Sequence, residues 1–347
     1  WLLKTIWLVH VIGNILCLLK PKPKNPEANM NISEIISYWG YKWEVYEVVS
    51  GDGYILPIYR IPCGKNETMD SSPKTVVYLQ HGLTLSASAW ILNPPSSSLG
   101  FLLADANFDV WLGNSRGNNY AMKHVYLDPN SEAFWDFSFD EQIKFDIPAI
   151  IDFIVNKTGQ KQIYYVGHSQ GTLLAYGAFA TNPQVAQKIK ANLALAPVVT
   201  TRYLSGAFRT IAYVDPTVIK SRIDVYAGQI PAGTSVRSIL HFAQGIRTGL
   251  VQAYNWGSEA LNMQHYNQST PPIYNLENMK VQTVIWSGVN DILANPMDVK
   301  NLAAKTNNLV YHEKTEKYNH VDFLIGKDVT VKVYKNLISF IKKDQSR

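Results

Sequence analysis

The stretch that most constrains the fold is a glycine-bounded serine placed between a strand pattern and a helix pattern. Residues 163–166 are β-branched or aromatic, which predicts a buried strand, and a segment with helical character opens at Thr172. Between them lies Gly167-His168-Ser169-Gln170-Gly171, the Gly-X-Ser-X-Gly pattern of a nucleophile elbow. The glycines leave room for a strained turn that lifts the serine hydroxyl clear of the backbone. We therefore predict that Ser169 is a nucleophile; the alternative is an ordinary strand-to-helix turn.

Strand patterns alternate with helix patterns along most of the chain. Strand character occupies residues 43–49, 54–60, 75–80, 107–112, 163–166, 192–195, 282–286 and 309–312, and helical periodicity occupies 139–157, 172–181 and about 329–341. The turn Ser50-Gly51-Asp52-Gly53 predicts a hairpin between the first two strands. The later alternation predicts the α/β class, with a mostly parallel central sheet flanked by helices.

The composition is that of a globular protein large enough for a sizeable core: 347 residues, of which 46% are hydrophobic. We interpret residues 25–347 as one domain, because α/β folds of this length are often single. The net charge of +5 comes from scattered lysines, so nucleic acid is not an expected partner. Cys17 and Cys63 form no metal-ligand pattern with histidine, and we expect neither a metal nor a cofactor.

The beginning of the chain has the character of a targeting segment. Residues 6–19 are mostly apolar, with Lys4 before them and a Lys-Pro repeat after them, which predicts a signal peptide or N-terminal hydrophobic segment over 1–24. This run is short for a membrane span, and an uncleaved anchor stays open because no clear cleavage site follows. Glycosylation acceptor patterns agree with a secretory route; they lie at Asn31, Asn66, Asn156 and Asn267.

A serine hydroxyl is a weak nucleophile at neutral pH, so it needs a base and a group that orients the base. In α/β enzymes with such an elbow, the acid and then the histidine follow the serine along the chain. Asp291 is the first acidic residue after the strand at 282–286 and is our candidate acid; its alternative is an Asx turn or a helix cap. His320, in a loop, is the candidate base in preference to His312, which ends a strand.

Acyl transfer also needs hydrogen-bond donors for the developing oxyanion. One expected donor is the backbone N–H of Gln170, the residue after the serine. The other should come from the loop after the strand at 75–80, where His81-Gly82-Leu83 permits a tight turn and Leu83 is the candidate. The alternative is that His81 and Gly82 only end the strand. His81 and the other histidines before Asp291 violate the expected order and are excluded as the base.

Several long motifs carry a family resemblance. They are residues 79–83, 109–118 and 167–171, together with 31–36, 231–236 and 265–269. From about Asn25 onwards the chain resembles the acid lipase family of gastric and lysosomal lipases. The resemblance implies an α/β-hydrolase fold and a serine carboxylic ester hydrolase that cleaves fatty-acyl esters of neutral lipids, such as triglycerides or cholesteryl esters, through an acyl-enzyme.

The resemblance also implies roles for particular residues. The triad would be Ser169, Asp291 and His320, with Leu83 and Gln170 as the oxyanion donors. The protein would be a secreted or lysosomal glycoprotein that meets its substrate at a lipid–water interface, where contact with a membrane or lipid-droplet surface is a further expectation.

The chain departs from the family mainly in the region that covers the site. The stretch between Val199 and Ser221 is much shorter than in the relatives, so we expect a reduced cap over about residues 200–255, with one short covering helix between 203 and 214. The cap cysteine pair of the relatives is absent, and Asn119-Tyr120-Ala121-Met122 replaces their Thr-Trp-Ser-Arg. Two alternatives therefore stay open: a lipase-like binding protein whose catalysis is impaired, and a non-lipid esterase or peptidase of the same fold.

Overall fold

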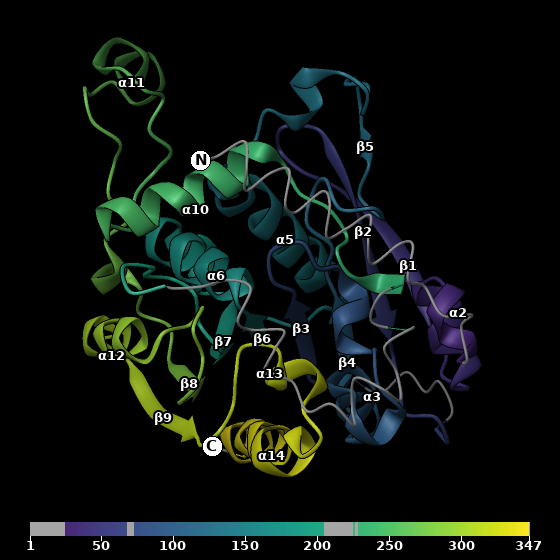
Figure 1. Cartoon of the computed structure of the whole chain (residues 1–347). Helices are drawn as coiled ribbons and strands as arrows, with labels where there is room; N and C mark the ends of the chain where they lie inside the picture. The colour runs from purple at the N-terminus through teal and green to yellow at the C-terminus, as the bar shows by residue number, and fades with distance from the viewer. Residues whose placement is uncertain (1–24, 68–72, 205–224, 226–227, 347) are drawn as a thin grey trace.

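The computed structural model describes residues 25–67, 73–204, 225 and 228–346 (Figure 1). The targeting segment expected at 1–24 lies outside the described residues, as does most of the stretch in which we expect a covering helix. The only cap residues described are therefore 200–204, 225 and 228–255.

The centre of the molecule is one nine-stranded sheet. The strands are β1 (Glu44–Val49), β2 (Tyr54–Ile61), β3 (Val76–Gln80), β4 (Asp109–Leu112), β5 (Lys123–His124), β6 (Ile163–His168), β7 (Ile189–Leu195), β8 (Thr283–Gly288) and β9 (Leu309–Thr315). Their order is β1-β2-β4-β3-β6-β7-β8-β9, with β5 paired to β2. All pairs from β4 to β9 are parallel, and the pairs made by β2 are antiparallel. The predicted fold class is confirmed.

Helices pack on both faces of the sheet. The α-helices are α2 (Ile32–Tyr38), α3 (Leu99–Asp105), α4 (Phe139–Glu141), α5 (Ile147–Thr158), α6 (Gln170–Thr181), α7 (Pro183–Ala186), α10 (Val236–Thr248), α11 (Glu259–Tyr266), α12 (Pro296–Lys305), α13 (Asp322–Ile325) and α14 (Lys335–Gln345). Short 3₁₀ turns occupy Pro26–Asn29, Ala87–Trp90, Pro95–Ser97, Glu132–Trp135 and Leu276–Asn278, and π-helical turns occupy Gln142–Asp146 and Thr330–Tyr334.

Alternate residues of the central strands enter two separate cores. On β3, Val77 and Leu79 join a cluster that includes residues of α3 and α14, whereas Val76 and Tyr78 join one that includes residues of α5 and α6. Figure 1 shows these helix pairs on opposite sides of the sheet. Such two-sided burial requires the continuous apolar strands that the sequence contains.

Several elements differ in their bounds from the prediction. The helix expected at 139–157 is interrupted by the π-helical turn Gln142–Asp146. Pro148 has no N–H to donate to the carbonyl of residue 144, which favours a wider turn there. The helix after the elbow begins at Gln170 rather than Thr172, and β9 continues to Thr315. Within the described residues, no helix has the length and apolar character needed to cross a membrane.

A buried arginine connects three segments that are far apart in the sequence. Arg116, in the loop after β4, has a fully buried side chain that donates to both carboxylate oxygens of Asp146. It also donates to Asp52 in the hairpin turn, at 2.6 and 2.8 Å, and its guanidinium lies 4.0 Å from the centre of the Tyr54 ring. This cation therefore ties the loop after β4 to the β1–β2 turn and to the helix ahead of β6.

Replacing Arg116 by Met should strongly destabilise the fold. The change leaves the buried Asp146 carboxylate without its counter-ion, a loss that typically costs about 3–5 kcal/mol. Asp52 is partly exposed, so Asp52→Asn should cost less, on the order of 1 kcal/mol. Urea denaturation of both variants measures the difference, and equal losses would contradict this assignment of the network.

Candidate active site

The structure places Ser169 on a strained turn between β6 and α6. Its backbone has φ 54° and ψ −121°, a conformation that non-glycine residues rarely adopt. A side chain at Gly167 would bring its Cβ within 2.7 Å of the Gly171 carbonyl carbon, and one at Gly171 would collide with the backbone carbonyl of Gln80. Both glycines are therefore required by close backbone approach, as expected for a nucleophile elbow.

The elbow lies where the strand order reverses. The chain passes from β3 outward to β4 and then returns to β6 on the other side of β3, so the loops after β3 and β6 are neighbours at the carboxyl ends of the strands. A Cβ at Gly82 would lie only 2.8 Å from the Ser169 Cβ and 3.3 Å from its Oγ. The loop after β3 thus runs directly against the serine.

The two candidate oxyanion donors are the chain neighbours of Ser169 and Gly82. Gln170 is the first residue of α6, and Leu83 follows Gly82. Among the described residues, none accepts a hydrogen bond from the backbone N–H of Leu83 or of Gln170. Both N–H groups are therefore unpaired among the described residues, as donors to a substrate oxygen must be.

The candidate acid and base contact each other directly. Asp291 follows β8, and its Oδ1 accepts hydrogen bonds from the backbone N–H groups of Leu293 and Ala294 at 2.9 and 2.8 Å. Its Oδ2 lies 3.0 Å from Nδ1 of His320, and both side chains are buried. Because a carboxylate only accepts, His320 donates through Nδ1, which leaves Nε2 to accept a proton from a hydroxyl.

Backbone contacts hold the two loops together. The N–H of Val289 donates to the Thr315 carbonyl, and the N–H of Asn290 donates to the Tyr318 carbonyl, each at 3.1 Å. The elbow itself contacts the base: His168 lies 3.1 Å through Nε2 from the His320 carbonyl, and the two rings are 4.8 Å apart. Since His168 precedes Ser169, this contact joins the His320 loop to the elbow, but the structure forms no hydrogen bond between the Ser169 hydroxyl and His320.

The competing candidates have other contacts. His312 lies in β9, where its Nε2 is 2.8 Å from the Ser287 hydroxyl, and the structure does not bring it to Asp291. The N-cap of α12 is Asn295, so Asp291 is not that cap. The other alternative, an Asx turn, is present through Oδ1 and coexists with the contact of Oδ2 with His320. Asp298 instead accepts hydrogen bonds from the backbone N–H groups of Arg202 and Tyr203 at 3.1 and 2.8 Å, which fastens the start of the cap region.

Two buried histidines lie beside the site, and the sequence indicates a side-chain function for neither. It predicts His168 only as a residue of the nucleophile elbow and His81 only as part of the turn after a strand, and both precede Asp291, which excludes them as the base. Burial lowers the pKa of both, that of His81 to about 4 and that of His168 well below its usual range. The sequence signal for such a function is their position: His81 directly precedes Gly82 and His168 directly precedes Ser169. A side chain next to these residues can affect the backbone geometry of the site.

Comparisons with known proteins decide the family. A lipase-specific model, described as the partial alpha/beta-hydrolase lipase region, matches residues 32–94, and the alpha/beta hydrolase fold model matches 75–214. A tear acid lipase-like protein of Mesocricetus auratus is 47% identical over 100% of this chain and 98% of its own length. The chain belongs to the acid lipase family.

Other members are similarly close. The gastric triacylglycerol lipase of Bos taurus is 44% identical over 99% of each chain. The lysosomal acid lipase/cholesteryl ester hydrolase of Macaca fascicularis is 43% identical over 92% of this chain and 93% of its own. Among solved structures, a monoacylglycerol lipase of Paleococcus ferrophilus covers 83% of this chain and 99% of its own at a TM-score of 0.53, with 16% identity, which supports the α/β-hydrolase fold alone.

The relatives have residues that this chain lacks. The match to the Mesocricetus protein extends over 394 aligned positions, whereas this chain has 347 residues, so at least 47 positions have no counterpart here. The reduced cap stays a prediction, because an alignment length does not place the missing positions in the chain.

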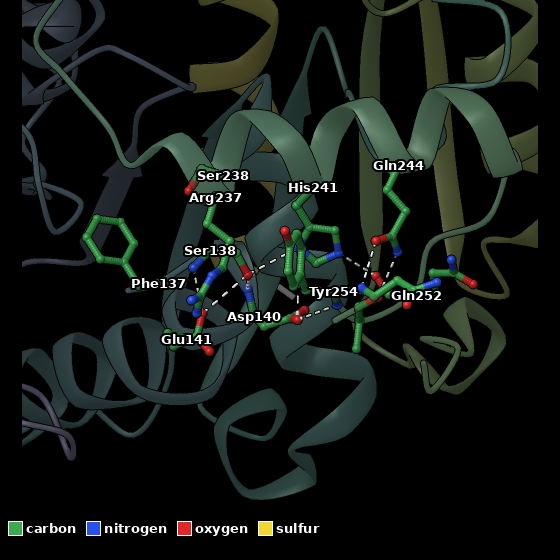
Figure 2. A network of polar contacts seen from close by, with 12 residues as sticks. Phe137, Ser138, Asp140, Glu141, Arg237, Ser238, His241, Gln244, Gln252 and Tyr254 are labelled. Carbon is green, nitrogen blue, oxygen red and sulfur yellow. Dashed lines mark hydrogen bonds and ion pairs between the residues drawn. The ribbon is translucent and has the colours of Figure 1, made fainter. Parts of the chain in front are cut away.

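Helix α10, in the region predicted to form the cap, is joined to the rest of the domain by a buried polar network (Figure 2). The His241 ring stacks on Phe139 at a centroid distance of 3.7 Å, with Nδ1 3.1 Å from the Ser138 hydroxyl and Nε2 2.8 Å from the Gln252 carbonyl. Burial lowers the pKa of His241 to about 4. The imidazole therefore stays neutral above about pH 4.

Asp140 belongs to the same network and responds to pH in the opposite sense. It accepts hydrogen bonds from the Tyr254 N–H at 2.8 Å and from the Tyr274 hydroxyl at 2.6 Å, and lies 3.9 Å from His241 (Figure 2). Burial raises the pKa of Asp140 to about 6, against the effect of these hydrogen bonds. His241 is neutral where Asp140 is ionised, and Asp140 is neutral where His241 is protonated, so at no pH are both side chains mainly charged.

These two pKa shifts predict opposite pH dependences of stability. The pKa of His241 is lower in the folded than in the unfolded protein, so its contribution to the free energy of unfolding is lost as the pH falls from 6.5 towards 4. The pKa of Asp140 is higher in the folded protein, so its contribution to the free energy of unfolding grows as the pH falls from 6 towards 3.8. As the pH is lowered from 7 to 4, the free energy of unfolding of His241→Gln should rise relative to that of the wild type. That of Asp140→Asn should fall relative to the wild type, and each change should be on the order of 2–3 kcal/mol.

Guanidinium denaturation at pH 4, 5.5 and 7 measures both trends. The double variant should depend on pH much as the wild type does. Parallel trends in the two single variants would contradict the assignment.

Proposed function

We propose that this chain is a serine carboxylic ester hydrolase in which Ser169, His320 and Asp291 form the catalytic triad. The observation that carries the proposal is the buried pair between Asp291 Oδ2 and His320 Nδ1 at 3.0 Å, formed in loops that lie beside the strained turn of Ser169. The order serine, acid, histidine along the chain supports the same roles. Membership of the acid lipase family makes ester hydrolysis the favoured reaction.

The proposed reaction has two acyl-transfer steps. His320 Nε2 accepts the Ser169 hydroxyl proton while Oγ attacks the ester carbonyl carbon, and the N–H groups of Leu83 and Gln170 stabilise the oxyanion. The carbon–oxygen bond to the alcohol then breaks, and His320 gives its proton to that alcohol. Water, deprotonated by His320, attacks the Ser169 acyl-enzyme; the fatty acid leaves and the proton returns to Ser169. Asp291 holds the imidazole and stabilises its charged form.

The proposed substrates are fatty-acyl esters of neutral lipids. The names of the relatives include triacylglycerol lipase and cholesteryl ester hydrolase, which supports this class. The surface of α10 supports contact with a lipid–water interface: Val236, Ile239 and Ile246 are exposed, whereas Ser238 and His241 are buried. An apolar outer face of this kind suits a lipid surface.

The proposed location is the secretory pathway, ending in secretion or the lysosome. The relatives include gastric and lysosomal lipases. The acceptor residues Asn31, Asn66, Asn156 and Asn267 are all exposed, so each is accessible for glycosylation.

A fluorophosphonate probe should label the wild-type protein at Ser169. Ser169→Ala should abolish labelling and ester hydrolysis, and His320→Gln should reduce hydrolysis by at least about 10³-fold, because the hydroxyl loses its base. Gel fluorescence and release of p-nitrophenol measure both effects. His312→Gln serves as the matched control, since His312 contacts Ser287 instead. Undiminished labelling of Ser169→Ala would overturn the proposed nucleophile.

The reduced cap should alter chain-length preference. A cap shields the acyl groove from water, so a smaller one should favour short or soluble esters over emulsified long-chain triglyceride. Initial rates on C4, C8 and C16 esters at pH 4 to 8 test this, with a full-length acid lipase as the reference. If the ratio of the long-chain rate to the short-chain rate is the same for the two enzymes, the predicted change in chain-length preference is wrong.

A further inference from the structure

His81 is a buried histidine that the proposed acid–base mechanism does not use. It directly follows β3, and its side chain lies in the loop that runs against Ser169. Its Nδ1 is 2.8 Å from the carbonyl oxygen of Gly82, and its Nε2 is 3.0 Å from the backbone nitrogen of Ser115. The imidazole therefore spans the loop after β3 and the loop after β4.

The chemistry of these partners fixes the tautomer. A backbone N–H only donates, so Nε2 must present its lone pair to Ser115, and the proton of a neutral ring must then lie on Nδ1. Nδ1–H consequently donates to the Gly82 carbonyl. Asn118 lies 3.4 Å from Nε2 through its amide nitrogen, which is compatible with an acceptor at that atom.

The Gly82 carbonyl belongs to the same peptide group as the Leu83 N–H. Among the described residues the only cis peptide bond is Ile230–Pro231, so the bond between Gly82 and Leu83 is trans. In a trans peptide the C=O and N–H point in opposite directions. A donor that holds the carbonyl therefore also directs the N–H to the opposite side.

We propose that His81 is a positioning residue for the oxyanion hole: it holds the Gly82–Leu83 peptide so that the Leu83 N–H faces the oxyanion formed at Ser169. This inference rests on the proposed function. The backbone N–H of Leu85 also donates to the Gly82 carbonyl, at 3.2 Å, so the peptide has a second, weaker restraint. Loss of His81 should therefore weaken the oxyanion hole without abolishing it.

Asn and Gln at position 81 separate the two hydrogen bonds. The side-chain amide of Asn occupies roughly the place of Nδ1 and keeps a donor for Gly82, whereas that of Gln reaches the place of Nε2 and keeps an acceptor for Ser115. Removal of one oxyanion donor typically costs 10²–10³-fold in kcat. We expect a fall of about 10–100-fold in kcat for His81→Gln, with KM changed less than about threefold, since Leu85 remains.

The kcat of His81→Asn should exceed that of His81→Gln and lie within about tenfold of the wild-type value. His312→Gln is the control for replacing a histidine, and melting temperatures show whether each variant is folded. If His81 served only to link the two loops through Ser115, His81→Gln would be the better variant of the pair, and that result would overturn the proposal. A loss confined to KM would do the same.

A measurement on the wild-type protein covers the case in which a variant does not fold. In ¹H–¹⁵N spectra, His81 should have a protonated Nδ1 and an unprotonated Nε2 at pH 6; the reverse tautomer would overturn the proposal. If the wild-type protein hydrolyses esters and His81→Gln has the same kcat, this inference is overturned and the proposed function is not. A wild-type protein that neither hydrolyses esters nor reacts with the fluorophosphonate would overturn the proposed function as well.

Discussion

Close backbone contact between β3, β6 and the start of α6 is the constraint on which the site depends. Gly171 lies so near the Gln80 carbonyl that a side chain would not fit, and Gly167 approaches the Gly171 backbone in the same way. This packing holds Ser169 at positive φ and presses it against Gly82. The strain of the turn is tolerated because the surrounding strands are fully buried and leave it no room to relax.

The rest of the site is attached to that junction by directed polar contacts. His168 joins the elbow to the His320 loop, Asp291 orients the imidazole, and His81 joins the loop after β3 to the loop after β4. Each of these side chains is buried, so each hydrogen bond is protected from competition with water. The site is therefore held by rigid strands and short loops, while helix α10 is attached separately through the network around His241.

The sequence was sufficient for those features that depend on local pattern or chain order. The apolar strands, the glycine-bounded serine and the order of Ser169, Asp291 and His320 need no tertiary information. It could not reveal the network of Arg116, Asp52 and Asp146 or the inward-facing His241, because their partners lie far apart in the chain. The π-helical turn before α5 was missed because apolar periodicity does not distinguish it from a continuous helix. The orientation of the His81 ring likewise depends on Ser115, which no spacing rule connects to it.

The most direct test of the central claim is to trap the acyl-enzyme. Wild-type protein is mixed with a p-nitrophenyl ester, quenched in acid within milliseconds to seconds, digested and analysed by mass spectrometry. The proposed mechanism predicts a burst of p-nitrophenol and one acyl group on the peptide that contains Ser169, with neither in Ser169→Ala. Turnover at an unchanged rate in Ser169→Ala, or an acyl group carried by another residue, would contradict it.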